Sequence, residues 1–436
     1  MTEQTSPSSS PILSLSLELV YKILDNLDDY TILCSIRDAY KKLNDIIDVY
    51  PRYRALTNLD LYCKGIQSEG AARLSYQLKY NTTITTLNLY ANNIGAEGAS
   101  YLASALSYNT TLTILDLNDN KYWRQRNPIF GQCIKTQSGK VGVQCLAEAI
   151  EDNEILTTLN LSSNKITREG AEYLARALHN NKTLTTLNLK KNQIKNEGVK
   201  YLADALRTNA TLTELNLTYG QIGDEGTRYL ADVLRNHTTL TILNLANNAI
   251  TAVGAQYLTN ALRDNTILTK LDLSSNTIGN HGIHYVVDTL QTNKTLTSLN
   301  IEHNEIEAQG IKYLADGLQS NTTLSILNLA NNDIGDEGAQ HLANGLQNNT
   351  ALTEIDLVNT QIGAKGAQYL LDALRNNITL IKLDLLCLAS TAHGLRPPML
   401  ELHDHIRQRN ESMRYFQTRN EEAQDQVDAS ADDTIR

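Results

Sequence analysis

An eleven-residue phrase returns along this chain with a period of 28 residues. Leu156–Ile166 reads Leu-Thr-Thr-Leu-Asn-Leu-Ser-Ser-Asn-Lys-Ile, and close copies begin at Leu184, Leu240 and Leu268. Self-similarity at a fixed period of this length indicates a solenoid, in which each repeat buries its apolar face only against its neighbours. The pattern therefore predicts a long stacked surface for holding another molecule, and it does not identify that molecule.

The first leucine of each copy gives a common numbering, in which it occupies position 1. The spacing is 28 residues except between Leu112 and Leu156, where it is 44, so the third repeat carries 16 extra residues. The sequence predicts eleven full repeats and a closing strand over residues 56–388, with an inserted loop near 121–141. The repeats begin at Leu56, Ile84, Leu112, Leu156, Leu184, Leu212, Leu240, Leu268, Leu296, Leu324 and Leu352, and the closing strand begins at Leu380.

Each repeat divides into two halves with different periods. The first half alternates with period two, which predicts a short strand. The second half places Ala171, Leu174, Ala175 and Leu178 at helical spacing. Strand, helix and strand in one direction form a parallel sheet with helices on one side. Because the helix layer is wider than the strand layer, we expect an α/β horseshoe with strands on the concave side and helices on the convex side.

These residues carry a family resemblance. The phrase LxxLxLxxNxI, with a Gly-Ala-x-x-Leu-Ala-x-Ala-Leu helix, resembles the leucine-rich repeat of the ribonuclease-inhibitor type over Leu56–Leu388. The resemblance implies that the position-9 asparagine lies inside the turn and bonds to backbone that would otherwise be buried unpaired. Repeats of this type serve many unrelated binding proteins, so the resemblance predicts the fold and leaves the function open.

The two ends of the chain differ from the repeats. Residues 1–11 are rich in Ser and Thr and are expected to be disordered. Residues 12–55 have a helical pattern that predicts a cap over the first repeat. At the other end we expect a helical cap over 389–416 and a polar, acidic tail over 417–436.

The N-terminal segment also resembles the opening of an F-box. That resemblance implies a surface for a Skp1-like adaptor, and the residues at its motif positions are Leu15, Glu18, Leu19, Ile23 and Leu27. Cap and F-box remain open alternatives, and one segment could serve both purposes.

Composition and charge restrict the function classes. The formal net charge of −10 disfavours nucleic acid, which needs a basic face, and a protein partner fits better. No apolar run reaches the length of a membrane span, and no signal peptide is expected. The five cysteines are scattered, and neither a metal site nor a catalytic constellation emerges. We therefore expect a non-enzymatic protein without cofactor or metal, in the cytoplasm or the nucleus, and its oligomeric state stays open.

The concave face is the expected docking surface, and its N-terminal third holds the strongest anchors. Interface energy usually comes from a few Trp, Tyr or Arg residues, and the inserted loop contains the single Trp of the chain beside two Arg. The alternative is a tolerated insertion, or one that arose in the gene model. The predicted partner-binding residues are Asp60, Tyr62, Tyr90, Asp116 and Asp119 on the concave face and Trp123, Arg124, Arg126 and Phe130 in the insertion.

The predicted function is a scaffold for protein–protein interaction, with a substrate receptor of a Skp1-type ubiquitin ligase as its specific form. The alternative is a GTPase-activating protein for a Ran-like small GTPase. Proteins of that class share this repeat type and act through an arginine in an early inter-repeat loop. Arg124 or Arg126 would then stabilise the charge of phosphoryl transfer.

Overall fold

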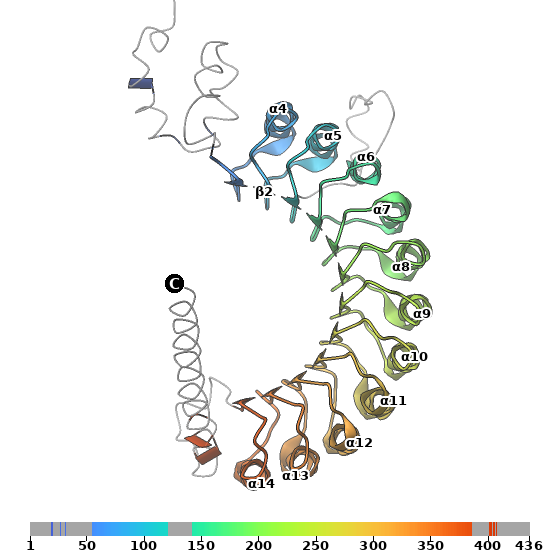
Figure 1. Ribbon diagram of the computed structural model, residues 1–436, viewed down its shortest axis with the longest axis vertical. Helices are drawn as coiled ribbons and strands as arrows, with labels where there is room; N and C mark the ends of the chain where they lie inside the picture. Colours follow the sequence, from blue (N-terminus) through green and yellow to red (C-terminus); the bar gives the residue numbers. More distant parts are fainter. Residues whose placement is uncertain are drawn as a thin grey trace, which may run out of the picture. The chain divides into compact units, whose positions relative to one another are not determined.

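The computed structural model describes residues 19–20, 27, 31, 55–120, 142–385, 401–402, 404–405 and 407. The chain divides into two compact units, Met1–Gln221 and Ile222–Arg436, and Figure 1 shows the strands and helices that each contains. The predicted N-terminus over 1–11, the insertion over 121–141 and the tail over 417–436 lie outside the described residues. Only isolated residues of the two predicted caps are described.

The first unit alternates short strands with helices. Its elements are β1 (Asn58–Asp60), α4 (Gln67–Leu78), β2 (Thr86–Asn88), α5 (Gly95–Leu106), β3 (Ile114–Asp116), α6 (Gly142–Glu151), β4 (Thr158–Asn160), α7 (Arg168–Asn180), β5 (Thr186–Asn188), α8 (Lys195–Leu206) and β6 (Glu214–Asn216).

The second unit continues the same alternation. Its elements are α9 (Gly223–Leu234), β7 (Ile242–Asn244), α10 (Ala252–Leu262), β8 (Lys270–Asp272), α11 (Gly279–Thr292), β9 (Ser298–Asn300), α12 (Ala308–Ser320), β10 (Ile326–Asn328), α13 (Gly335–Leu346), β11 (Glu354–Asp356), α14 (Ala364–Leu374) and β12 (Lys382–Asp384).

Within each unit the strands pair in parallel and in chain order. Between β4 and β5 the register joins Thr158 to Thr186, Leu159 to Leu187 and Asn160 to Asn188, a separation of one repeat. The middle residue of each strand from β1 to β11 is buried, while its two neighbours face the other side. Residues at the same repeat position therefore lie side by side on neighbouring strands.

The helices bury the residues that the sequence pattern assigns to the core. In α7, Ala171, Leu174, Ala175 and Leu178 are all buried. A glycine near the start of each helix permits close packing: a Cβ on Gly198 would lie 2.6 Å from Cγ2 of Ile194. In each unit the helices cover one face of the sheet, so the predicted leucine-rich-repeat horseshoe class is confirmed.

Hydrogen-bonded ladders of side chains join successive repeats. Asn276, at position 9, accepts from the backbone N–H groups of Asn248 (2.9 Å) and Ile250 (3.0 Å) and donates to the carbonyl of Leu273 (2.8 Å). This is the bonding that the family resemblance implies. Threonines at position 2 form a second ladder, in which the hydroxyl of Thr185 donates to the carbonyl of Thr157 (3.1 Å).

A third ladder lies in the turn between each helix and the next strand. Oδ1 of Asn181 accepts from the backbone N–H groups of Thr183 (3.0 Å) and Leu184 (2.7 Å), and its Nδ2 donates to the carbonyl of Ile150 (2.7 Å). Asn181 belongs to one of the recurring Asn-x-Thr sequences, and its amide is already engaged by the fold. Among the described residues, no helix is both long and apolar enough to cross a bilayer.

Candidate protein-interaction site

Two predicted anchors, Tyr62 and Tyr90, form a stacked pair at the ends of β1 and β2. Their ring centroids are 4.9 Å apart, and the ring planes meet at 22°. Both residues occupy position 7, and parallel strands are spaced about 4.8 Å apart, so the register alone brings the rings to stacking distance. Tyr62 is 51% exposed and Tyr90 is half-buried. The pair is therefore a large aromatic surface that the protein core does not use.

The predicted acidic residues Asp60 and Asp116 have a structural role at position 5. Oδ1 of Asp60 accepts from the backbone N–H of Tyr62 (3.1 Å), and Oδ1 of Asp116 accepts from that of Asn118 (2.8 Å). The second carboxylate oxygen of Asp116 accepts from Nδ2 of Asn160 (3.0 Å). Position 5 is Asn or Asp in every repeat because this side chain satisfies a backbone donor at the strand end. Any partner would meet carboxylates that already have hydrogen-bond partners.

Asp119 lies at position 8 of the third repeat and is half-buried. Its φ of +50° falls in the left-handed region, and its backbone N–H donates to the carbonyl of Ser162 (3.0 Å). Residues at position 8 adopt this conformation throughout the repeats, including Ala91 and Ser163. The conformation of Asp119 is thus a property of the fold, while its carboxylate adds negative charge to the strand ends.

An exposed isoleucine at this end of the sheet is missing from the predicted site. Ile114, at position 3 of β3, is 38% exposed and lies two residues before Asp116. Positions 3 and 5 flank the buried position 4, so both point to the concave side. The predicted concave residues come from positions 5, 7 and 8, and reading position 3 as well would have found Ile114.

Position 3 also contributes to a charged hollow in the second unit. A cavity of about 160 Å³ is lined by β10, β11 and β12, with Glu354 and Lys382 at position 3 and Asp356 and Asp384 at position 5. Nζ of Lys382 lies 3.4 Å from Glu354 and 3.6 Å from Asp384, and these carboxylates raise the pKa of Lys382. Burial raises the pKa of Asp356. Lys382 is already paired with two carboxylates, and the hollow has no exposed aromatic side chain among its lining residues, so it is a weaker candidate than the aromatic pair.

The electrostatics of the aromatic pair are simple. The neighbouring side chain of Cys63 raises the pKa of the Tyr62 phenol above its ordinary value. Among the described residues, no group of three or more His, Cys, Asp or Glu side chains could hold a metal ion. What this end of the sheet offers a partner is aromatic area, an exposed isoleucine and a negative rim.

The structure describes only two of the predicted F-box-like residues. Leu19 is 49% exposed, and Leu27 is half-buried. Seven other predicted site residues lie outside the described residues. They are Trp123, Arg124, Arg126 and Phe130 from the insertion and Leu15, Glu18 and Ile23 from the N-terminal segment.

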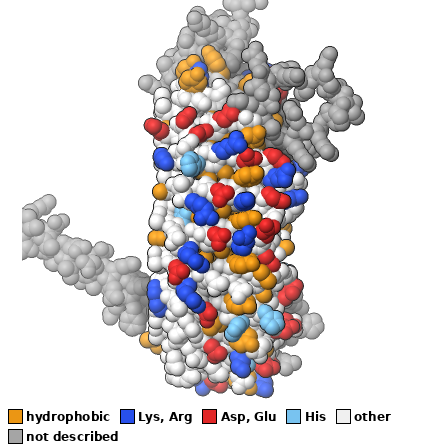
Figure 2. Space-filling model, turned by 90° about the vertical axis from the view of Figure 1, so that its right-hand side faces the viewer, with side chains coloured by type: hydrophobic (Ala, Val, Ile, Leu, Met, Phe, Trp, Pro, Cys, Tyr) orange, Lys and Arg blue, Asp and Glu red, His pale blue; other side chains and the backbone are white. Residues whose placement is uncertain are grey.

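The helix-bearing face presents a different surface. In Figure 2 its hydrophobic side chains, tyrosines included, lie among Lys, Arg, Asp and Glu side chains. The hydroxyl of Tyr229 donates to Glu225 (3.0 Å), and that of Tyr101 donates to Glu97 (3.2 Å). These rings cover their own helices and bond to nearby carboxylates, which is a structural role for tyrosine on this face.

Family models match most of the repeats. The model described as Leucine Rich repeat matches residues 80–103, 108–121, 152–175, 180–203, 208–231 and 348–371. The model described as TMOD/LMOD Leucine-rich domain matches residues 227–334. No curated protein sequence gives a match.

Two solved structures give the scale of the structural similarity. A fragment described as Leiomodin-1 Actin-Binding Site 2 is 23% identical, with 39% of this chain and 79% of the fragment covered and a TM-score of 0.26. An internalin from Listeria monocytogenes is 18% identical, with 84% of this chain and 92% of the internalin covered and a TM-score of 0.45. The family matches and the repeating strand–helix architecture agree, and the chain is accordingly a protein built from leucine-rich repeats.

Proposed function

We propose that this protein is a non-enzymatic scaffold that binds a protein partner on the concave surface of its first three repeats. The stacked Tyr62–Tyr90 pair is the observation that carries the proposal. The fold does not require aromatic residues at position 7, because Ser162, Thr218 and Ala246 occupy it elsewhere. Exposed tyrosines that the fold does not need are typical anchors of protein interfaces.

The surroundings of the pair indicate the chemistry of its partner. Ile114 adds exposed apolar area, and Asp60, Asp116 and Asp119 add negative charge. A partner surface with an apolar anchor and flanking basic residues would complement this arrangement. The net charge of −10 on the whole chain acts in the same direction over longer distances.

The test compares the proteins captured by the intact chain with those captured by variants. We expect Tyr62→Ala and Tyr90→Ala each to weaken capture of the main partner, by about tenfold or more if the rings are interface anchors. Tyr201→Ala is the matched control, because Tyr201 is 39% exposed on a helix. A partner set that is unchanged in both concave variants would contradict the proposal.

The insertion is proposed to extend this surface through Trp123, Arg124, Arg126 and Phe130. Trp and Arg are the residue types that most often dominate binding energy. Replacing residues 121–141 with residues 165–169, which link the strand turn to the helix in the next repeat, removes the 16 extra residues and keeps the length of the repeat. This change should weaken capture of the same partner while the melting temperature stays close to that of the intact chain. Unchanged capture would assign the insertion no part in binding.

A more specific form of the proposal is a substrate receptor of a Skp1-type ubiquitin ligase in the cytoplasm or nucleus. It depends on Leu15, Glu18, Leu19, Ile23 and Leu27, with the resemblance of that segment to an F-box as its only support. Co-purification with Skp1 that is lost in a Leu19→Asp variant would support it. A chain that captures its target but no Skp1 would leave only the general scaffold.

Actin and a Ran-like GTPase are two further candidate partners, and each has a direct test. The match of residues 227–334 to the TMOD/LMOD leucine-rich domain makes actin a candidate for the second unit, and co-sedimentation with filaments and binding to monomers test it. The GTPase-activating alternative requires Arg124 or Arg126. If the intact protein does not accelerate GTP hydrolysis by Ran, that alternative is excluded.

A further inference from the structure

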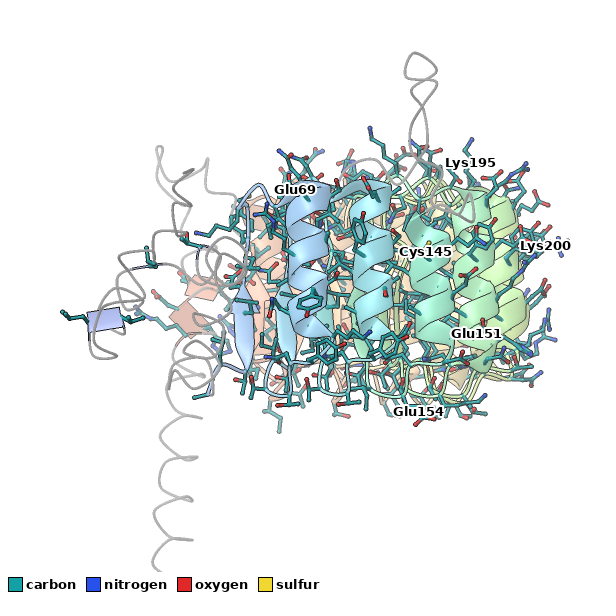
Figure 3. All side chains as sticks on the ribbon, turned by 90° about the horizontal axis from the view of Figure 1, so that it is seen from above. Glu69, Cys145, Glu151, Glu154, Lys195 and Lys200 are labelled. Carbon is teal, nitrogen blue, oxygen red and sulfur yellow. The ribbon has the colours of Figure 1, made fainter. Side chains whose placement is uncertain are left out.

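A basic cluster lies on the first unit at the edge where strands end and helices begin. It consists of Lys190 at position 7, Lys191 at position 8 and Lys195 at position 12 of one repeat. Figure 3 shows Lys195 at the same edge as Glu69, and Glu151 and Glu154 at the opposite edge. Within the described part of the chain, none of the three lysines forms an ion pair.

Tyr219, from the next repeat, lies beside one of these lysines. The backbone N–H of Lys191 donates to the carbonyl of Thr218 (2.7 Å), and that of Lys195 donates to the carbonyl of Gly220 (2.9 Å). Nζ of Lys191 is 5.8 Å from the ring centroid of Tyr219, which is 47% exposed. One ammonium group therefore lies against an exposed aromatic ring, and backbone hydrogen bonds hold the main chain of Lys195 beside the residue that follows Tyr219.

Lys195 is unfavourable for the fold in two respects. Its φ of +59° is in the left-handed region, and four other repeats place glycine with positive φ at position 12: Gly95, Gly223, Gly279 and Gly335. A residue with a Cβ is strained there. Lys195 is also the first residue of α8, where the helix dipole disfavours a positive charge. Glycine at position 12 would therefore be more favourable for stability than Lys195.

The positive charge of the lysine cluster is specific to this repeat. In the second unit, the repeat that begins at Leu296 has Glu302 at position 7 and Glu307 at position 12, where the cluster has Lys190 and Lys195. The repeat itself therefore does not require positive charge there. Three lysines without an arginine fork form a weak phosphate site, and a chain of net charge −10 repels nucleic acid. Carboxylates beside an aromatic or aliphatic side chain complement this cluster better.

We propose that Lys190, Lys191, Lys195 and Tyr219 form a second docking site, which binds an acidic segment of a partner protein. The lysines pair with carboxylates of the segment, and Tyr219 packs against one apolar or aromatic side chain between them. The site is separate from the Tyr62–Tyr90 surface, and either proposal can fail without the other.

The test uses the full chain and a labelled polyglutamate peptide with one central phenylalanine, followed by fluorescence anisotropy. We expect the double change Lys191→Gln with Lys195→Gln to weaken binding about tenfold, and added salt to weaken it further. Tyr219→Ala should lower the affinity for this peptide and not for the same peptide without phenylalanine. Lys365→Gln is the matched control, because Lys365 also lies 5.8 Å from a tyrosine ring, that of Tyr369.

Lys195→Gly separates a binding role from a structural one. It should weaken peptide binding about threefold while the melting temperature stays equal or rises, because strain is relieved. Gln67→Gly relieves the same strain at position 12 of the first repeat, where φ is +57°, and should leave binding unchanged. Variants that bind the peptide as the intact chain does would overturn the proposal. Single-stranded RNA that binds more tightly than the peptide would also overturn it, in favour of a nucleic-acid site.

Discussion

At the scale of single residues, the repeat is a template against which each exception has a physical consequence. Ten of the turns between a helix and the next strand contain an asparagine whose Oδ1 accepts two backbone hydrogen bonds. His237 replaces it in one turn. Its Nδ1 accepts from the N–H groups of Thr239 (3.2 Å) and Leu240 (3.1 Å), and its Nε2 is buried without a hydrogen-bond partner. The Nδ1 of His237 thus replaces the Oδ1 acceptor of the asparagine, while no hydrogen bond replaces the one that the asparagine Nδ2 donates.

His237 should make stability depend on pH. Burial lowers the pKa of His237 in the folded state below its ordinary value of 6.5. As the pH falls below 6.5, the unfolded chain takes up the proton first, so stability is complete above 6.5 and is lost as the pH falls through the folded-state pKa. Thermal melting at neutral and mildly acidic pH measures this loss. His237→Asn should reduce the loss and raise stability at neutral pH by about 1 kcal/mol. An identical pH profile in the variant would exclude His237 as its source.

At the scale of secondary-structure elements, the distance between neighbouring helices decides what a glycine position tolerates. A Cβ added to Gly198 in α8 would lie 2.6 Å from Cγ2 of Ile194 and 3.1 Å from Cβ of Ala171. A Cβ added to Gly317 in α12 would meet no atom closer than 3.4 Å. Both glycines are buried in helices, and only one of them is required by packing.

The two glycines should respond to alanine with opposite signs. Gly198→Ala should destabilise the protein by about 1–3 kcal/mol, because the added methyl overpacks the contact between α7 and α8. Gly317→Ala should stabilise it by about 0.5–1 kcal/mol, because alanine restricts the unfolded chain and fits the available space. Chemical denaturation of the two variants beside the intact chain checks both signs. Equal effects would show that helix propensity, and not packing, decides these positions.

At the scale of the whole molecule, stability is shared between neighbours along the stack. Each repeat contacts chiefly the repeats beside it, as the pairing of consecutive strands within each unit shows. Local damage should therefore spread to adjacent repeats and weaken with distance.

Leu174→Asp tests this sharing. Leu174 is 2% exposed in α7, and a buried unpaired carboxylate there should cost roughly 3 kcal/mol or more. Amide hydrogen exchange should show protection lost first in α6, α7 and α8, with little change in α13. Arg176→Ala, on the same helix, removes an exposed ion pair with Glu172 and should cost under about 1 kcal/mol. Uniform loss of protection over the whole chain would contradict nearest-neighbour coupling.

The sequence by itself determined the architecture of this protein, because a 28-residue period fixes strand, helix, buried leucines and asparagine ladder together. The two aromatic residues at position 7, Tyr62 and Tyr90, were also visible in it. Tertiary structure decided what each side chain meets. It shows that Asp60 and Asp116 accept hydrogen bonds from backbone N–H groups two residues on, and that the ammonium of Lys191 lies against the ring of Tyr219. The physical reason is that the parallel register brings residues one repeat apart to about 4.8 Å from each other. The contacts between their side chains depend on that spacing and on side-chain direction, which the sequence does not state.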